Sequence, residues 1–287
     1  MSRHQKFLKC ILLTPIILPS FLTLSASCKK RQIEPLNLPN KLGTWIWKLD
    51  KITDKHIDFA YKNNVKEVYL NIPKINEHAK NIIKKFKDKN IKVFLLLGRK
   101  EWIYNISEVE NKINWFIELQ QKYSYFEGIH FDIEPHQYPE FKNSSEKRKE
   151  YLIKFINLIY KLKTKFSNIK FHYDIPFWFN DLINFNNTEK EAYKHIIDLA
   201  DKIYVMAYRN SSQGILKISK NIREYAQKNN KEIGIAVNTK INNEEITSFG
   251  NKSKLFMNNE LNLLSKNIEN KNSIAIHHLD SWFNLKD

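Results

Sequence analysis

Phe126-Glu127-Gly128-Ile129-His130-Phe131-Asp132-Ile133-Glu134-Pro135-His136 is the stretch around which the rest of the sequence is organised. Its small or apolar residues alternate with His130 and Asp132, which predicts a buried strand. Pro135 ends the run because proline lacks a backbone N–H and restricts the residue before it. Side chains two residues apart share one face of a strand, so His130, Asp132 and Glu134 should line the same side.

The two acids of this stretch have a chemical consequence. Two carboxylates held this close cannot both ionise without cost, so either Asp132 or Glu134 should have a raised pKa and be available as a proton donor. A strand whose last residues are merely solvated is the alternative, and for an isolated Asp-x-Glu it would be preferred. The organisation of the remaining chain favours the functional interpretation.

The sequence alternates between strand-like and helix-like segments. Apolar strand-like runs lie at 44–49, 67–72, 92–97, 128–133, 170–175, 202–207, 232–237 and 273–278. Segments with helical spacing lie between them, at 54–63, 77–87, 108–121, 145–165, 189–200, 216–229 and 254–268. Eight strands alternating with seven helices over about 245 residues predict a single-domain (β/α)8 TIM barrel, an α/β fold, over residues 42–287.

Little chain remains after the last strand, so the eighth helix should be short or missing. A doubly wound sheet is the alternative, but no Gly-rich phosphate loop follows the first strand. The barrel is therefore the preferred fold.

The N-terminus has the features of an export signal. Residues 1–28 combine a basic start, an apolar core at 11–24 that is too short to span a membrane, and the small residues 25–27. Cys28 follows directly, which resembles a bacterial lipobox, although Leu24 lies four rather than three residues before it. We expect an exported lipoprotein anchored to the membrane at the cell envelope or surface through lipidated Cys28. Ordinary signal cleavage, which would leave a free thiol, is the alternative.

A short polar segment, 29–41, should tether the barrel to this anchor. The other cysteine, Cys10, lies within the signal, so the barrel contains neither a disulfide nor a cysteine-based metal site. Histidine pairs at helical spacing and Gly-x-Ser-x-Gly are absent from the sequence. We therefore expect no cofactor and no metal, and neither metal-dependent hydrolysis nor serine acyl transfer.

The chain carries a formal net charge of +16. Its basic residues are spread along helical segments such as 80–89 and 161–165, without the interleaved aromatic residues of a single-strand-binding surface. A solvated helix surface explains them better than a nucleic-acid site, and export also argues against nucleic acid as a partner. We expect a monomer.

The strand ends carry the candidate site, because barrels of this kind place their chemistry at the C-terminal ends of the strands. Asp132 and Glu134 supply acid chemistry, Asp174 is a further carboxylate, and Tyr208 can donate a hydrogen bond. Nearly all of the remaining strands also end in a polar or aromatic side chain, which favours a binding site at this end of the barrel. The candidate binding residues are Trp47, Asn71, Arg99, Trp178, Arg209, Asn238, Asp280 and Trp282.

The flat faces of Trp47, Trp178 and Trp282 suit sugar rings, whereas core packing is preferred for Trp45 and Trp115. His277 and His278 are adjacent in a predicted strand and should point to opposite faces, so they do not form a paired metal site.

Several of these motifs resemble a known family. The run 126–134 resembles the fourth-strand motif Asp-Gly-x-Asp-x-Asp-x-Glu of chitinase-type family 18 glycoside hydrolases. Val205-Met206-Ala207-Tyr208 is similar to their sixth-strand Met-x-Tyr, and Trp282 falls where they place a tryptophan under the cleaved sugar. With 174–178 and 275–278 included, the chain more closely resembles an uncharacterised branch of exported bacterial glycoside-hydrolase-like lipoproteins.

The resemblance implies cleavage of a polysaccharide or amino-sugar glycan, with carbohydrate as substrate or ligand. Glu134 would be the general acid, Asp132 would orient and stabilise a substrate-assisted intermediate, and Tyr208 would hold the N-acetyl group of the substrate. The sequence departs from the motif at Glu127 and His130, which replace aspartates.

A further departure concerns Asn238. Related exported barrels carry a glutamate at this position, at the end of the seventh strand, and asparagine cannot replace a carboxylate nucleophile in a two-carboxylate retaining mechanism. A surface-tethered glycosidase is the first hypothesis. A non-catalytic glycan-binding lipoprotein on a degenerate barrel is the second, and a surface protein that binds anionic polymers through its basic exterior is the third.

Overall fold

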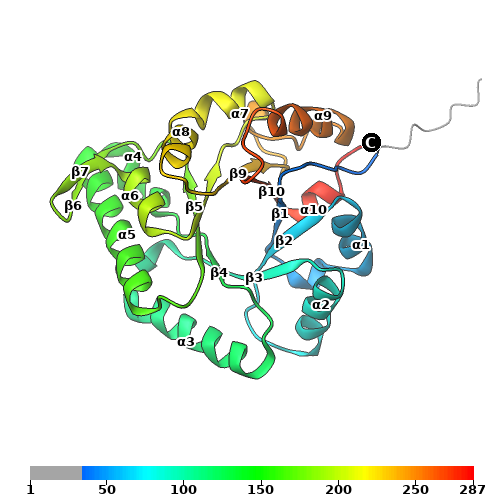
Figure 1. Ribbon diagram of the computed structural model, residues 1–287, viewed down its shortest axis with the longest axis horizontal. Helices are drawn as coiled ribbons and strands as arrows, with labels where there is room; N and C mark the ends of the chain where they lie inside the picture. The colour runs from blue at the N-terminus through cyan, green and yellow to red at the C-terminus, as the bar shows by residue number, and fades with distance from the viewer. Residues whose placement is uncertain (1–33) are drawn as a thin grey trace, which may run out of the picture. The chain divides into compact units, whose positions relative to one another are not determined.

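The computed structural model describes residues 34–287, and in this part of the chain eight parallel strands close into a barrel (Figure 1). Their order around the ring is β1-β10-β9-β8-β5-β4-β3-β2. The bounds are β1 Leu42–Ile46, β2 Val65–Leu70, β3 Lys92–Leu97, β4 Ile129–Phe131, β5 Phe171–Pro176, β8 Lys202–Met206, β9 Ile233–Asn238 and β10 Ser273–His277. The predicted (β/α)8 barrel is confirmed.

Helices surround the strands on the outside of the ring (Figure 1). The α-helices are α1 Asp54–Lys62, α2 Glu77–Asp88, α3 Ile106–Tyr123, α4 Pro139–Asn143, α5 Ser145–Lys165, α6 Ala192–Leu199, α7 Ser212–Ile218, α8 Lys220–Lys228, α9 Lys254–Ser265 and α10 Leu279–Phe283. Short 3₁₀ turns are η1 Leu49–Lys51, η2 Lys100–Ile103, η3 Pro135–Gln137 and η4 Glu245–Thr247. The helix after the last strand is short, as predicted, and the helix predicted at 216–229 is divided at Ser219 into α7 and α8.

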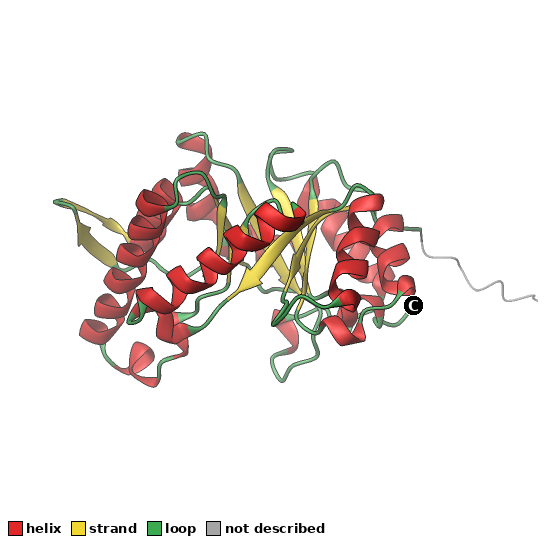
Figure 2. Ribbon diagram, turned by 90° about the horizontal axis from the view of Figure 1, so that it is seen from below, coloured by secondary structure: helices red, strands yellow, loops and turns green. Residues whose placement is uncertain are grey.

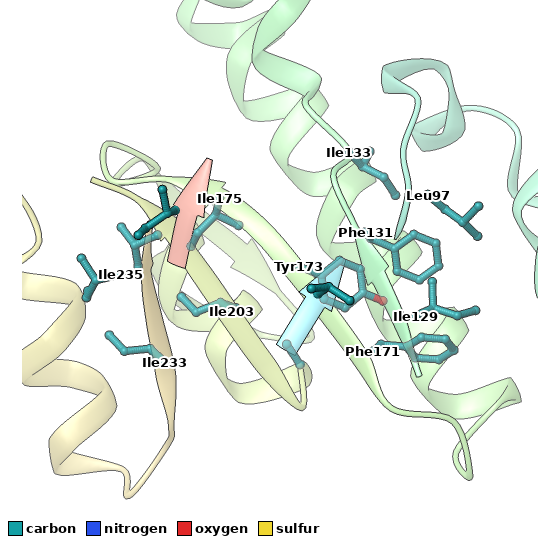
Figure 3. Close-up of a cluster of buried hydrophobic side chains, with 14 of the residues drawn as sticks. Leu97, Ile129, Phe131, Ile133, Phe171, Tyr173, Ile175, Ile203, Ile233 and Ile235 are labelled. Atoms are coloured by element: carbon teal, nitrogen blue, oxygen red, sulfur yellow. The ribbon is translucent and has the colours of Figure 1, made fainter. Parts of the chain in front are cut away.

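The outward faces of the strands form the main core. Ile129, Phe131 and Ile133 alternate with the polar residues of the same stretch and are at most 1% exposed. They pack among side chains of neighbouring strands, and the ring of Phe131 stacks on Tyr173 at 5.3 Å between centroids (Figure 3). This burial of alternate residues is what holds the other set of side chains inside the ring.

Large aromatic rings fill the barrel interior, and two glycines make room for them. A Cβ at Gly43 would lie 2.3 Å from the hydroxyl oxygen of Tyr69, and one at Gly234 would lie 2.1 Å from Cδ1 of Tyr204. The interior is therefore a packed layer and not a pore. Its buried hydrophobic members are Trp45, Tyr69, Phe94, Leu96, Tyr204, Ala236 and Ala275.

One element was not predicted. An antiparallel hairpin of β6 Leu182–Phe185 and β7 Thr188–Glu191 lies between β5 and α6 and projects from the helical layer (Figure 2). Asn186 and Asn187 turn it with φ of 50° and 59°, a left-handed conformation that asparagine tolerates. The prediction assigned the start of a helix to β7 because Asn-Asn was not read as a hairpin turn.

The chain before the first strand packs onto the barrel. Leu36 and Leu38 are buried, and the amide of Asn40 donates to the carbonyl oxygens of Glu269 and Asn272 at 3.0 and 2.9 Å. Residues 36–40, which the sequence assigned to a polar tether at 29–41, therefore pack on the barrel, because their apolar side chains have a surface to cover. The predicted export signal and the predicted lipidation site, Cys28, lie outside the described residues. In residues 34–287 no helix has the length and apolar character needed to cross a membrane.

Candidate functional site

A cavity of about 320 Å³ opens at the C-terminal end of the barrel. Asp132 and Glu134 reach it from the chain after β4, Asp174 from β5, and Tyr208 from the chain after β8. All four predicted catalytic residues therefore meet at one place, and the volume lies within the range of small-molecule sites. The other lining residues are Trp45, Trp47, Met206 and His277.

His130 lies deeper, inside the barrel. It is fully buried, its ring stacks on Tyr69 at 3.9 Å between centroids, and its Nε2 lies 2.9 Å from Oδ2 of Asp174. Burial lowers the pKa of His130 well below its usual value, so the imidazole is neutral near pH 7. Its Nδ1 has no hydrogen-bond partner in the part of the chain that the structure describes. The hydrogen bond of the His130 imidazole is therefore to Asp174, on the neighbouring strand.

Asp174 receives a second bond from the opposite side of the barrel. The indole Nε1–H of Trp45 donates to Asp174 Oδ2 at 3.0 Å, and both side chains are buried. Burial raises the pKa of Asp174 well above its usual range, and the Trp45 hydrogen bond partly opposes this. Trp45 was expected to be a core residue only. Trp45 is a core residue, but it also lines the cavity. Trp45 and Trp47 are two residues apart and therefore lie on the same, inner face of the barrel, a signal in the sequence that could have placed both at the site.

Glu134 is the acid best suited to donate a proton near neutral pH. Burial first, and the charge of Asp174 second, raise its pKa to about 7, while a hydrogen bond from Gln137 opposes the rise. Nε2 of His136 lies 3.4 Å from the other carboxylate oxygen, and burial lowers the pKa of His136 to about 4. Glu134 thus exists in both protonation states around pH 7, with neutral partners.

Asp132 and Tyr208 complete the cluster. Burial, then Asp174 and Glu134, raise the pKa of Asp132, and its buried Oδ1 has no hydrogen-bond partner among residues 34–287. Burial, followed by the charges of Asp132, Asp174 and Glu134, raises the pKa of Tyr208 well above its usual value, so its hydroxyl keeps its proton. The site therefore presents proton donors and an unpaired carboxyl oxygen to whatever enters it.

Trp47 and His277 form one wall of the cavity. The indole Nε1–H of Trp47 donates to Nε2 of His277 at 2.9 Å, which places the proton of the neutral imidazole on Nδ1. Burial, followed by the charges of His278 and Lys240, lowers the pKa of His277 to about 3. The half-buried ring of Trp47 is thereby held in place at the cavity.

Four other predicted binding residues lie near the strand ends with their side chains already engaged. The amide of Asn71 donates to the carbonyl oxygen of Leu96 at 3.3 Å. Arg99 is exposed and pairs with Glu108 at 2.8 Å. Trp178 packs edge-on to His136. Arg209 lies over the ring of Phe177 and donates a hydrogen bond to the carbonyl oxygen of Tyr208. None of the four lines the cavity.

The structure does not bring Asn238 and Trp282 to the cavity. Asn238 is 7% exposed and its Oδ1 accepts the backbone N–H of Lys240, so it shapes a turn. Trp282 is 1% exposed and packs edge-on to Phe59, because α10 turns it into the outer core. It offers no face to a sugar ring, contrary to the expectation. Trp47 occupies the aromatic position at the cavity instead.

His277 and His278 do not point to opposite faces as expected. Both line a second cavity, because the strand ends at His277 and His278 is already the N-cap residue of α10. Asp280, the last predicted binding residue, also lines this second cavity. Within residues 34–287, no cluster of three or more His, Cys, Asp or Glu is arranged to hold a metal ion.

Comparison with known proteins supports the fold. No protein-family model and no curated protein matches the chain. A GH18 chitinase from Pseudoalteromonas aurantia superposes with a TM-score of 0.57 at 12% identity, covering 85% of this chain and 97% of that one. The chain therefore has the same barrel fold as this chitinase.

Two further solved structures share this barrel. The spore cortex-lytic enzyme SleL of Bacillus cereus has a TM-score of 0.52 at 10% identity, covering 85% of this chain and 72% of its own. A β-1,3-glucanosyltransferase of Rhizomucor miehei, solved with laminaritriose, has a TM-score of 0.51 at 10% identity, covering 83% and 86%. Superpositions at identities this low establish a common architecture only, so the chemistry has to be argued from the residues of the site.

Proposed function

We propose that this protein is a glycosidase that cleaves a polysaccharide or amino-sugar glycan, with Glu134 as general acid. The observation that carries the proposal is the meeting of Asp132, Glu134, Asp174 and Tyr208 at one cavity in the mouth of the barrel. A carboxyl group with a pKa of about 7 suits proton donation to a leaving oxygen at neutral pH. The half-buried face of Trp47 is placed to contact a sugar ring.

The proposed reaction is substrate-assisted. Glu134 gives its proton to the glycosidic oxygen as the bond to the anomeric carbon breaks, and the N-acetyl carbonyl oxygen of the substrate forms the new bond to that carbon. Asp132 accepts the amide N–H through the carboxyl oxygen that has no partner among the described residues, which orients and stabilises the cyclic intermediate, and the Tyr208 hydroxyl donates to the acetyl oxygen. Water then attacks the anomeric carbon as the bond between that carbon and the acetyl oxygen breaks, which restores the N-acetyl group, and the Glu134 carboxylate takes up a proton from the water.

Substrate assistance fits the residues better than a protein nucleophile. Asn238, where related barrels were expected to have a glutamate, is bound to the Lys240 N–H and does not line the cavity. The N-acetyl oxygen supplies the nucleophile that the chain lacks there. Buried donors to Asp174, from Trp45 and His130, keep that carboxyl oriented behind the site.

The same proposal includes the place of action. The basic, apolar and small-residue order of 1–28, ending at Cys28, supports export and a lipid anchor, which would set the barrel at the cell envelope or surface as a monomer. A polymeric glycan outside the cell is a substrate that such an anchored enzyme can reach.

A non-catalytic glycan-binding lipoprotein is the second candidate. Both carboxylate oxygens of Glu134 already have neighbours on the protein, Gln137 and His136, which would hold an acid that no longer transfers protons. This candidate keeps the cavity and its aromatic wall but predicts no turnover.

The test is to assay the full chain and its Glu134→Gln and Tyr208→Phe variants against N-acetylated glycans, with binding measured in parallel. We expect Glu134→Gln to lower turnover by about 10²–10⁴-fold, and Tyr208→Phe by about 10–10³-fold, with binding retained. Glu224→Gln, on the exposed face of α8, is the matched control. Turnover that survives Glu134→Gln would rule out this mechanism, and binding without turnover by any form would favour the second candidate.

A further inference from the structure

A second cavity, of about 390 Å³, lies beside the candidate active site. The two cavities share Trp45, Trp47 and His277, so the hydrogen-bonded pair of Trp47 and His277 borders both of them. A polymer whose cleaved sugar occupies the first cavity would therefore place a neighbouring unit in the second. What lines the second cavity decides which neighbouring unit is accepted.

The second cavity is basic. Lys48 and Lys51 reach it from the chain after β1, and Lys240 reaches it from the chain after β9. All three side chains are exposed, and none forms an ion pair with any other residue in 34–287. The only carboxylate in the lining is Asp280, which lies 3.5 Å from Nε2 of His56. The cations are therefore free to meet a ligand, and the acid is partly occupied.

His278 adds a neutral donor to the same lining. Its Nδ1 accepts the backbone N–H of Ser281 at the start of α10, so the proton of the neutral ring is on Nε2. Lys240 and Lys51 are close enough to contribute to lowering the pKa of His278, after the larger effect of burial. The loops after β1 and β9 and the N-cap residue of α10 thus bring hydrogen-bond donors and positive charge to the second cavity.

We infer that the second cavity binds an acidic group, and that the glycan recognised by this site carries a carboxylate, sulfate or phosphate on the sugar beside the one in the first cavity. This inference rests on the proposed function for the position of the cleaved sugar. Oxygen anions match the ammonium groups of the lysines and the imidazole N–H of His278. The raised pKa values of the acids next door also reduce the repulsion that an anion would meet there.

A solvated basic rim is the competing explanation, since exposed lysines are common on this chain. It differs in one respect that can be measured. A rim attracts any polyanion in proportion to total charge, so lysines elsewhere should contribute as much as Lys51 and Lys240. Lys149 on α5 and Lys228 on α8 are exposed, line neither cavity and form no ion pair in the described part of the chain, so they are matched controls.

The experiment measures binding by the full chain carrying Glu134→Gln, so that cleavage does not interfere. The probes are N-acetylglucosamine oligomers of one length and three acidic oligomers of that length, bearing uronate, sulfate ester or phosphate. We expect at least one acidic oligomer to bind about tenfold more tightly than the neutral one. Adding Lys51→Gln and Lys240→Gln should remove about tenfold of that affinity and change neutral binding by less than about twofold. Which acidic probe is preferred identifies the anion.

Two results would overturn the inference. One is neutral oligomers binding as tightly as every acidic one, and the other is Lys149→Gln with Lys228→Gln lowering acidic binding as much as the cavity pair does. Failure of the proposed function looks different. Lysine-dependent binding of an acidic oligomer with no cleavage by the unmodified chain would leave the acidic subsite standing and remove the hydrolase. Cleavage of neutral oligomers with no acidic preference would do the reverse.

Discussion

Nε2 of His130 and Oδ2 of Asp174 lie 2.9 Å apart inside the barrel, and both side chains are almost completely buried. The pair joins β4 to β5 beneath the candidate site. His130 occupies the position where the chitinase motif that this stretch resembles has an aspartate, so a neutral imidazole, hydrogen-bonded to the neighbouring strand, lies where that motif has another acid. An additional buried carboxylate there would have raised the cost of ionising the others.

His130→Phe tests this bond. The substitution keeps an aromatic ring against Tyr69 but removes the hydrogen bond to Asp174, so we expect a loss of about 1–3 kcal/mol in the free energy of unfolding. His172→Phe is the control, because His172 is buried in the same interior, packs on Phe94 at 4.3 Å and makes no bond to Asp174. Denaturant unfolding of both variants measures the difference, and equal losses would show that the bond contributes nothing.

Trp45→Phe should separate orientation of Asp174 from packing. It deletes the indole donor at 3.0 Å and leaves a smaller ring, so we expect it to lose about 0.5–1.5 kcal/mol more stability than a control tryptophan substitution, and to lower any turnover. Trp102→Phe is that control, since Trp102 is equally buried and its Nε1 has no partner in the described chain. Unfolding and activity assays should agree. Similar behaviour of the two variants would contradict a role for the indole N–H.

The raised pKa of Glu134 predicts the pH dependence of activity. The general acid must be protonated, and it loses its proton as the pH rises through about 7, so kcat/KM should fall on the alkaline side from about that pH. A pH–rate profile of the unmodified chain measures this. An activity that stays constant to pH 9 would exclude Glu134 as the acid.

The same shift predicts the pH dependence of stability. An acid whose pKa is 4.5 in the unfolded chain and about 7 in the folded one binds more protons when folded between these values. The contribution of Glu134 to the free energy of unfolding should therefore fall as the pH rises from about 4.5 to about 7. Asp132 and Asp174 act in the same direction, and buried histidines with lowered pKa values act in the opposite one, so the comparison with Glu134→Gln isolates this contribution: the stability of the variant should fall less, or rise more, over this pH range. Equal slopes in the two proteins would contradict the prediction.

Gly98 supports the position of Asp132. A Cβ at Gly98 would lie 2.0 Å from the carbonyl oxygen of Asp132, a backbone atom that cannot move alone. We expect Gly98→Ala to cost about 1–3 kcal/mol of stability and to reduce turnover by displacing the acid. Gly214→Ala, in α7, meets mainly movable side-chain atoms of Ser211 and Arg209 and should be close to neutral. Thermal unfolding of both proteins checks this, and a harmless Gly98→Ala would show that β3 and β4 tolerate separation.

The fold was predictable because its signals are local. Alternation along each strand and helical spacing between strands are set by residues a few positions apart, so eight repeats of one pattern identified the barrel before any contact was known. The stacking of His130, Asp132 and Glu134 on one side followed from the same period of two. The hairpin β6–β7 was missed because its signal, Asn186-Asn187, is a turn preference and not a period.

What the sequence by itself determined is the barrel and the acids that one of its strands carries, because both depend on near neighbours along the chain. Only the tertiary structure decided that Asp174 is held by Trp45 and His130, that Trp282 turns into the outer core and Trp47 takes the wall, and that Lys51 and Lys240 face one hollow. These relationships join side chains from different strand ends. The closure of the barrel sets the distances between these side chains, and the spacing of residues within a single segment carries no information about those distances.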